Sequence, residues 1–164
     1  MSGTQGYVAL EWIRGELENT LHNAQVGLEA VSESADAATS MRTCLTAIHQ
    51  VHGTLKMVQL EGPTQMAAEM EQAAQSLMNP SITEVRLAQE TLMQAILQLP
   101  AYLDRLHREQ EDSEKNYLPM VNSLRAVRGE ERIQGSDAEL EEGDRPDLGP
   151  LTQAAAGEVV NAYL

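Results

Sequence analysis

Residues 48–60 read IHQVHGTLKMVQL and have the spacing of one amphipathic helix. When the pattern is followed back to residue 41, apolar side chains recur at alternating steps of three and four. They are Met41, Leu45, Ile48, Val51, Leu55 and Val58. This is the period of an α-helix with one buried face. The sequence therefore predicts a helix over about residues 37–60 that packs its apolar face into a helical core.

A second stripe lies beside that apolar face and contains His49, His52, Gly53 and Lys56. Relative to His49, the others stand at i+3, i+4 and i+7, so all four share one side of the helix. A phosphoryl-accepting histidine needs an exposed nucleophilic nitrogen, room for a phosphate and nearby positive charge. A solvated histidine, or a docking stripe, is the commoner outcome for such a pattern. Both interpretations stay open: phosphoryl acceptance by His49, or partner contact by His52, Gly53 and Lys56.

The helical period continues through most of the chain. Further stripes cover about residues 7–31, 63–78, 81–109 and 117–127. Short turns join them, which favours antiparallel neighbours. Asp36 is suited to cap the start of the second helix, and Gly62 is suited to end it. The sequence predicts an all-α fold, an up-down four-helix bundle with an additional C-terminal helix.

The composition changes after Gly129. Residues 130–147 contain eight acidic residues against two arginines, with frequent glycine and proline and no aromatic residue. This composition is typical of a solvated linker. We therefore expect a helical domain over residues 1–129 and an acidic, flexible tail over residues 130–164. The tail would lead to the next domain of a longer protein.

The charge balance limits the classes of partner. The chain has 11 basic and 25 acidic residues, a net charge of −14, which disfavours nucleic acid and anionic membranes. No apolar run approaches the roughly 20 residues of a membrane span. The single cysteine, Cys44, falls near the apolar face of its helix and fits a reducing compartment. We expect a cytoplasmic protein with protein partners and no membrane insertion.

Motifs that would indicate an enzyme are missing from the sequence. It contains no glycine-rich phosphate loop, no paired cysteines and no nucleophile elbow. His49 and His52 could seat a metal ion on one helix face, but such a site usually needs a third protein ligand. The other two histidines, His22 and His107, lie on different predicted helices. We expect no catalysis by this chain, no cofactor and no metal.

The pattern HxxHGxxKMVxL at residues 49–60 resembles the motif of the histidine phosphotransfer (HPt) family. In that motif the phosphoryl-accepting histidine is followed by lysine at +3 and glycine at +4. His49 takes the acceptor position and Gly53 the glycine position, whereas His52 stands where the lysine usually is. A neutral imidazole is a poorer phosphate partner than an ammonium group that is always charged. Lys56, one turn further on, could substitute in part.

Three ordered segments resemble a narrower group, the N-terminal modules of type IV pilus chemosensory histidine kinases (ChpA/PilL type). They read YVALEWIRGEL at 7–17, CLTAIHQVHGTLKMV at 44–58 and LPMVNSLRAVRGE at 118–130. The resemblance implies a large cytoplasmic hybrid kinase with several phosphotransfer-like domains, a CheA-like core and a receiver. Its first module would be FimL-like, similar to a pilus scaffold protein. Such modules often keep the fold while the acceptor is degraded.

Two functions follow from this resemblance. The first is a pseudo-phosphotransfer module that docks proteins in the control of type IV pili and twitching motility. Its partners would be pilus scaffold proteins, receiver domains of response regulators or other domains of the kinase. The alternative is an active phosphotransfer domain in which His49 accepts the phosphoryl group within a phosphorelay. The histidine at the +3 position favours docking.

Overall fold

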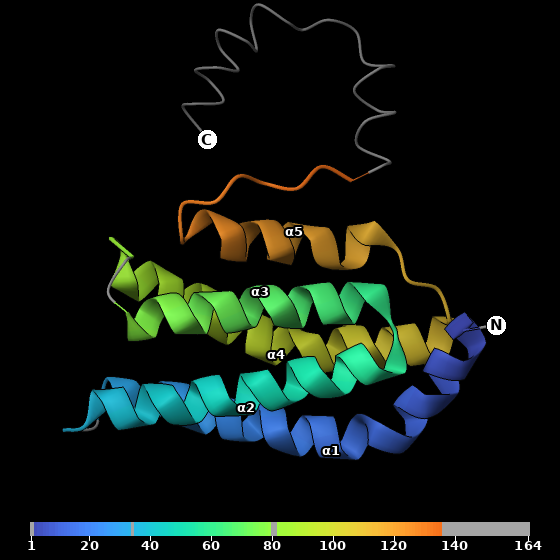
Figure 1. Ribbon diagram of the computed structural model, residues 1–164, viewed down its shortest axis with the longest axis horizontal. Helices are drawn as coiled ribbons and strands as arrows, with labels where there is room; N and C mark the ends of the chain where they lie inside the picture. Colours follow the sequence, from blue (N-terminus) through green and yellow to red (C-terminus); the bar gives the residue numbers. More distant parts are fainter. Residues whose placement is uncertain (1, 34, 80–81, 136–164) are drawn as a thin grey trace, which may run out of the picture. The chain divides into compact units, whose positions relative to one another are not determined.

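The computed structural model describes residues 2–33, 35–79 and 82–135, and these ranges form five α-helices without a strand (Figure 1). The helices are α1 (Ser2–Val31), α2 (Ala37–Val58), α3 (Glu61–Met78), α4 (Val85–Glu109) and α5 (Glu114–Ala126). The predicted all-α class is confirmed. Residues 136–164 of the predicted acidic tail lie outside the described residues. None of the described helices combines the length and the apolar character that a membrane crossing requires.

The first four helices close into a ring in which α1 packs against α2 and α4, and α3 packs against the same two helices. The fifth helix lies outside this ring, as an added layer against α3 and α4 (Figure 1). Short turns connect α1 to α2 and α2 to α3, which makes these neighbours antiparallel. The predicted four-helix bundle with one additional helix is therefore the observed architecture.

The core is aliphatic and rich in methionine, as the stripes in the sequence predict. Its largest fully buried side chains come from all four bundle helices and include Leu10, Leu17, Leu21, Ile48, Leu55, Met66, Met70, Leu92, Ile96, Leu99, Leu103 and Leu106. Cys44 is also buried, as expected from its place near the apolar face of α2. Burial of apolar area at about 25 cal/mol per Å² is the main force that holds such a bundle together.

Helix starts differ from the predicted ones by a few residues, for local reasons. Asp36 caps α2 as predicted, because its side chain accepts a hydrogen bond from the backbone N–H of Thr39. The cap of α5 is Ser113, whose hydroxyl accepts from the N–H of Lys115, so this helix begins three residues earlier than expected. α4 begins four residues later than expected. Ile82, which precedes it, is nevertheless buried.

Gly62 does not end α2, which corrects the sequence-based expectation. Gln59 ends that helix with a left-handed backbone (φ 59°), and Gly62 lies in the first turn of α3. A Cβ atom on Gly62 would lie within 3 Å of side-chain atoms of Tyr102, Asp112 and Tyr117. Glycine is therefore required here for close packing rather than for a helix end.

Asp112, in the turn before α5, explains why Gly62 is so tightly enclosed. Its carboxylate accepts hydrogen bonds from the backbone N–H of Gly62 (2.9 Å) and from the hydroxyl of Tyr102 (2.5 Å). An anion at the first turn of a helix satisfies an N–H group that has no partner within the helix. One side chain thus ties the turn between α4 and α5 to the start of α3.

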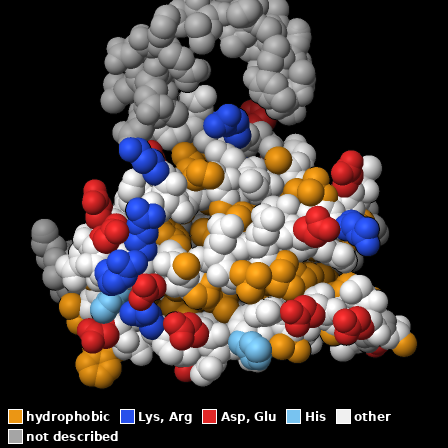
Figure 2. Space-filling view, turned by 180° about the vertical axis from the view of Figure 1, so that it is seen from behind, with side chains coloured by type: hydrophobic (Ala, Val, Ile, Leu, Met, Phe, Trp, Pro, Cys, Tyr) orange, Lys and Arg blue, Asp and Glu red, His pale blue; other side chains and the backbone are white. Residues whose placement is uncertain are grey.

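Charged side chains of both signs are mixed on the rear face of the molecule, and several lysine and arginine side chains lie along one edge (Figure 2). Asp104 of α4 contacts Arg14 of α1 at 2.9 Å and Arg108 of its own helix at 3.1 Å. Arg105 pairs with Glu109 at 3.3 Å. These arginines therefore already have acidic neighbours, and the Arg14–Asp104 pair links α1 to α4.

Candidate phosphoryl-acceptor and docking site

The second helix presents its polar stripe to solvent, as its periodicity predicts. His49, Gly53 and Lys56 are exposed, while Ile48 and Val51 on the adjacent face are fully buried. The side chain of His49 is 72 % exposed and that of His52 is 24 % exposed. A Cβ atom on Gly53 would have no neighbour within 4 Å, so the surface beside His49 is open.

Glu71 of α3 joins the two histidines of this stripe. Its Oε2 atom lies 2.8 Å from Nδ1 of His49, and its Oε1 atom lies 2.8 Å from Nδ1 of His52. The side chain of Glu71 is only 13 % exposed, so this carboxylate sits largely shielded between the two helices. The structure therefore builds a His–Glu–His cluster from α2 and α3.

Glu71 is not among the site residues that the sequence predicts. The one signal available is its place directly after the buried Met70, which puts it at the edge of the apolar face of α3. Nothing in the sequence says which neighbouring helix that edge faces. The packing of α3 against α2 is what brings Glu71 to His49.

The electrostatics of the cluster determine which ring nitrogen is available. Burial would raise the pKa of the Glu71 carboxyl, but hydrogen bonds from His52 and His49 lower it further than burial raises it. Glu71 is therefore ionised at neutral pH and can only accept hydrogen bonds. Nδ1 of each ring must then carry the proton, which leaves the lone pair of a neutral His49 on Nε2, at the far edge of an exposed ring.

The cations expected to assist a phosphate at His49 are poorly placed for it. His52, at the +3 position, already has its Nδ1 atom engaged with Glu71. Lys56 stands two turns along the helix, about 10 Å from His49 in rise. The negative charge of Glu71 also opposes any anion at the neighbouring imidazole. The surroundings of His49 are thus less favourable to a phosphoryl group than the sequence motif by itself indicates.

Large apolar side chains are exposed at the end of the bundle where α1 begins and α2 ends. Trp12 is 82 % exposed, Met57 is 80 % exposed and Val8 is 53 % exposed. The two helix ends are adjacent, because a Cβ atom on Gly6 would lie 2.8 Å from the carbonyl oxygen of Val58. Trp12 stands six residues from Gly6, about 9 Å along α1. Val8 and Trp12 are four residues apart and share one side of α1. Together with Met57, on the adjoining end of α2, we call these exposed side chains the apolar patch.

The apolar patch is likewise not among the sites that the sequence predicts. Trp12 falls outside the stripe formed by Leu10, Ile13 and Leu17, so its exposure could have been read from the helical period. Met57 lies within the motif at residues 49–60, but the motif predicts no contact role for it. Within the described ranges, no group of three or more histidine, cysteine or acidic side chains is arranged to hold a metal ion.

Comparison with known proteins agrees with this fold. Scaffold protein FimL of Pseudomonas aeruginosa is 26 % identical over 132 residues, which cover 80 % of this chain and 23 % of FimL. The chain thus spans less than a quarter of the length of that relative. No solved structure matches the chain. The family model described as Hpt domain matches residues 8–109, which span α2 with its histidine stripe and nearly all of the four-helix ring. The chain belongs to the Hpt domain family.

Proposed function

We propose that this chain is a docking and scaffolding module with an HPt fold, which binds proteins through the exposed side of α2 and the adjoining start of α1. The observation that carries the proposal is the apolar patch, in which Trp12 and Met57 are more than three-quarters exposed. Similarity to a scaffold protein supports the same class of function. The partners would be pilus scaffold proteins, receiver domains or other domains of a CheA-like hybrid kinase that controls type IV pili and twitching motility.

The energetics of the patch suit a protein partner. Tryptophan and methionine are enriched in protein interfaces, and tryptophan is prominent among the residues that dominate binding energy. An aromatic side chain buries roughly 150–250 Å² on full burial, worth several kcal/mol at about 25 cal/mol per Å². The open surface at Gly53 lets a partner approach the adjacent turn of α2 closely.

A binding experiment tests the docking function directly. The ¹⁵N-labelled chain is titrated with purified receiver domains and pilus scaffold proteins from the same organism, and amide shifts are mapped onto α1 and α2. Trp12→Ser and Met57→Ser should each weaken binding at least tenfold, about 1.4 kcal/mol. Leu87→Ser, at an exposed apolar position on α4, is the matched control and should leave binding unchanged. Shifts confined to α3, α4 and α5 would contradict the proposal.

Substitutions in the histidine stripe give a second test of docking. Gly53→Glu adds bulk and charge to the open surface and should weaken binding without unfolding the bundle. His49→Gln removes the candidate acceptor and should leave both binding and twitching nearly unchanged. Loss of twitching in His49→Gln with binding intact would favour phosphotransfer instead.

Active phosphotransfer by His49 is the second candidate function, and one observation favours it. Glu71 holds Nδ1 of His49 and so directs a lone pair to the exposed Nε2 atom. The test is incubation of the chain with the cognate kinase core and ATP, followed by assay for acid-labile, base-stable phosphate. If the chain is a docking module, little or no phosphate should be found on it. Stoichiometric label that is absent from His49→Gln would establish the relay.

A further inference from the structure

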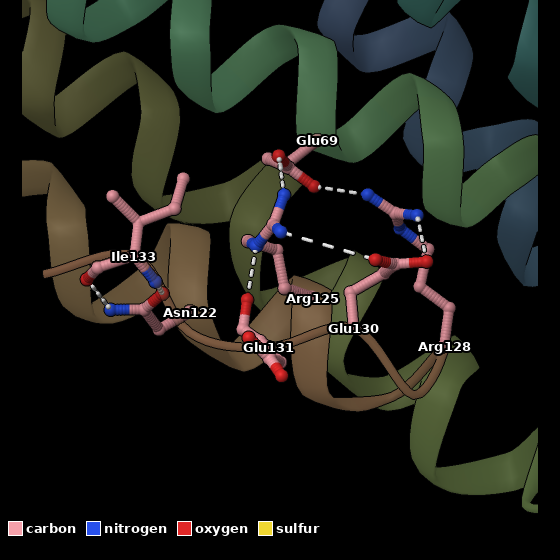
Figure 3. A network of polar contacts seen from close by, with 7 residues as sticks. All are labelled: Glu69, Asn122, Arg125, Arg128, Glu130, Glu131 and Ile133. Atoms are coloured by element: carbon pink, nitrogen blue, oxygen red, sulfur yellow. Dashed lines mark hydrogen bonds and ion pairs between the residues drawn. The ribbon is translucent and has the colours of Figure 1, made fainter.

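After α5 the chain turns back on itself and runs along the helix it has just left (Figure 3). Gly129 makes the turn with a left-handed backbone (φ 76°). Beyond it, Arg125 contacts Glu131 and Asn122 contacts Ile133, so the segment proceeds toward the start of α5. We call residues 130–133 the strap.

Asn122 pairs with the strap as a neighbouring β-strand would. Its Nδ2 atom donates to the carbonyl oxygen of Ile133 at 3.0 Å, and its Oδ1 atom accepts from the N–H of Ile133 at 2.6 Å. One side-chain amide thus satisfies both backbone groups of Ile133. The side chain of Ile133 is half-buried and packs against the core.

A second contact fixes the middle of the strap. The Nε atom of Arg125 donates to the carbonyl oxygen of Glu131 at 2.6 Å. Glu130 adds ion-pair contacts to Arg125 at 4.0 Å and to Arg128 at 3.8 Å, and its own side chain is 51 % exposed. Such long, solvated pairs contribute little to stability and are screened by salt.

Other contacts hold α5 without any strap residue, although they use the same Arg125 and Arg128 side chains. The carboxylate of Glu69 in α3 accepts hydrogen bonds from Nη1 of Arg125 at 2.9 Å and from Nη2 of Arg128 at 2.6 Å (Figure 3). The side chain of Glu69 is only 11 % exposed, so this carboxylate is shielded from water. Its hydrogen bonds to the two guanidinium groups are charge-assisted. The buried face of α5, formed by Tyr117, Met120, Val121 and Leu124, adds apolar packing.

We propose that the strap is a releasable latch that sets where the chain leaves the bundle. In the closed state the strap is bound to α5, and the chain leaves the bundle beside Asn122, near the middle of this helix. In the released state it departs at Gly129, at the end of the helix. Release frees four residues, which span about 13 Å when extended. The two states therefore differ in the reach and in the starting point of whatever follows residue 133.

One arrangement makes release possible without unfolding. The strap is held by hydrogen bonds from Asn122 and Arg125, by the ion pairs of Glu130, by a backbone hydrogen bond from the N–H of Glu130 to the carbonyl oxygen of Arg125 (2.9 Å) and by packing of Ile133. The Glu69 contacts and the apolar face of α5 include no strap residue, so they can stay closed while the strap opens.

Amide hydrogen exchange of the full chain, followed by NMR, tests the latch. The N–H of Ile133 should exchange at least tenfold more slowly than in an unstructured chain, yet at least tenfold faster than the N–H of Val51 in the core, as a locally opening unit does. Asn122→Leu should abolish the protection of Ile133 and leave that of Val51 within about twofold. Asn116→Leu, on the same helix and away from the strap, is the matched control and should change neither.

A second variant covers the case in which Asn122→Leu perturbs α5. Ile133→Pro removes the N–H group that donates to Oδ1 of Asn122, and residue 133 lies outside the five helices. It should make the backbone of Glu131 mobile in the ¹⁵N heteronuclear NOE while core amides stay protected. Two results would overturn the proposal: an unprotected Ile133 amide in the wild-type chain, or protection of Ile133 equal to that of Val51. The first means that no strap forms, and the second means that it opens only with global unfolding.

Discussion

Glu71 of α3 holds the imidazole of His49 on α2 through a 2.8 Å contact between Oε2 and Nδ1. The same carboxylate holds His52 through its other oxygen at the same distance. The candidate acceptor histidine is therefore part of the contact between two helices and not an isolated surface side chain. This arrangement makes the cluster important both for the orientation of His49 and for the packing of α2 on α3.

Replacing Glu71 tests that structural role. Glu71→Gln keeps the shape but removes the charge that both imidazoles contact, and it should lower the free energy of unfolding by about 1–2 kcal/mol. Urea denaturation at pH 7 measures the change. Glu109→Gln is the matched control, because Glu109 is 43 % exposed and pairs with Arg105 within one helix. The control should change stability by less than about 0.5 kcal/mol.

The contribution of Glu71 should depend on pH in a defined direction. Its pKa in the folded chain lies below the ordinary value of 4.5, because the hydrogen bonds from the two histidines outweigh burial. A carboxyl with a lowered pKa stabilises the folded state above its unfolded pKa, and this stability is lost as pH falls through the folded pKa. The difference in stability between wild type and Glu71→Gln should therefore be largest above pH 4.5 and shrink on acidification. A difference that grows toward low pH would contradict the assigned contacts.

Replacing glycine by alanine should change the stability of the chain in opposite directions at two positions. Gly62→Ala places a methyl group within 3 Å of Tyr102, Asp112 and Tyr117 and should cost about 1–3 kcal/mol or more through overpacking. Gly53→Ala meets nothing within 4 Å in a helix interior and should stabilise the chain by up to about 1 kcal/mol. Thermal unfolding of both variants gives the comparison. Equal effects of the same sign would show that the two sites are not packed as described.

Cys44 should be chemically inert in the folded chain. Burial raises the pKa of its thiol to about 12, and the residue is fully buried, so little thiolate forms at pH 8 and reagents cannot reach it. A thiol-specific reagent such as DTNB should react with the native chain at least a hundredfold more slowly than with the urea-unfolded chain. Rapid native labelling would mean that the α1–α2 contact opens readily.

Trp12 should contribute little to stability. Its side chain is 82 % exposed, so Trp12→Ser removes few contacts within the bundle and should shift stability by less than about 0.5 kcal/mol. Calorimetry measures this shift, and Leu17→Ser, at a fully buried position on the same helix, should unfold the chain at a much lower temperature. A large loss in Trp12→Ser would indicate that this side chain packs inside the chain rather than against a partner.

Several parts of the site follow from sequence periodicity. The stripe of Ile48, Val51 and Leu55 predicted the buried face of α2. The helix positions outside this stripe predicted that His49 and Gly53 are exposed. Helical spacing is local, so a stretch of about 20 residues contains the whole signal. The roles of His49, His52, Gly53 and Lys56 in contacting a phosphate or a partner stay predictions.

Other parts required contacts between distant residues. Glu71 lies 22 residues from His49, and the Gly62–Asp112 hydrogen bond spans 50 residues. Gly62 followed by proline resembles a helix end in sequence, and the left-handed residue that does end α2 is Gln59, which sequence preferences do not favour. The expected boundary at Gly129 rests on a change in composition, whereas the contacts of the strap continue to Ile133.

The amino-acid sequence alone determined the all-α class, the order of the helices and the exposed stripe of α2, because each depends on the 3.6-residue period within a single segment. Tertiary structure alone decided that Glu71 holds His49 and His52, that Gly62 must have no side chain, and that Asn122 pairs with the strap. Each of these depends on which helix edges meet in the packed bundle. Apolar stripes specify that helices bury their faces together, but the polar contacts at the edges are set by the register and rotation adopted once the core is packed.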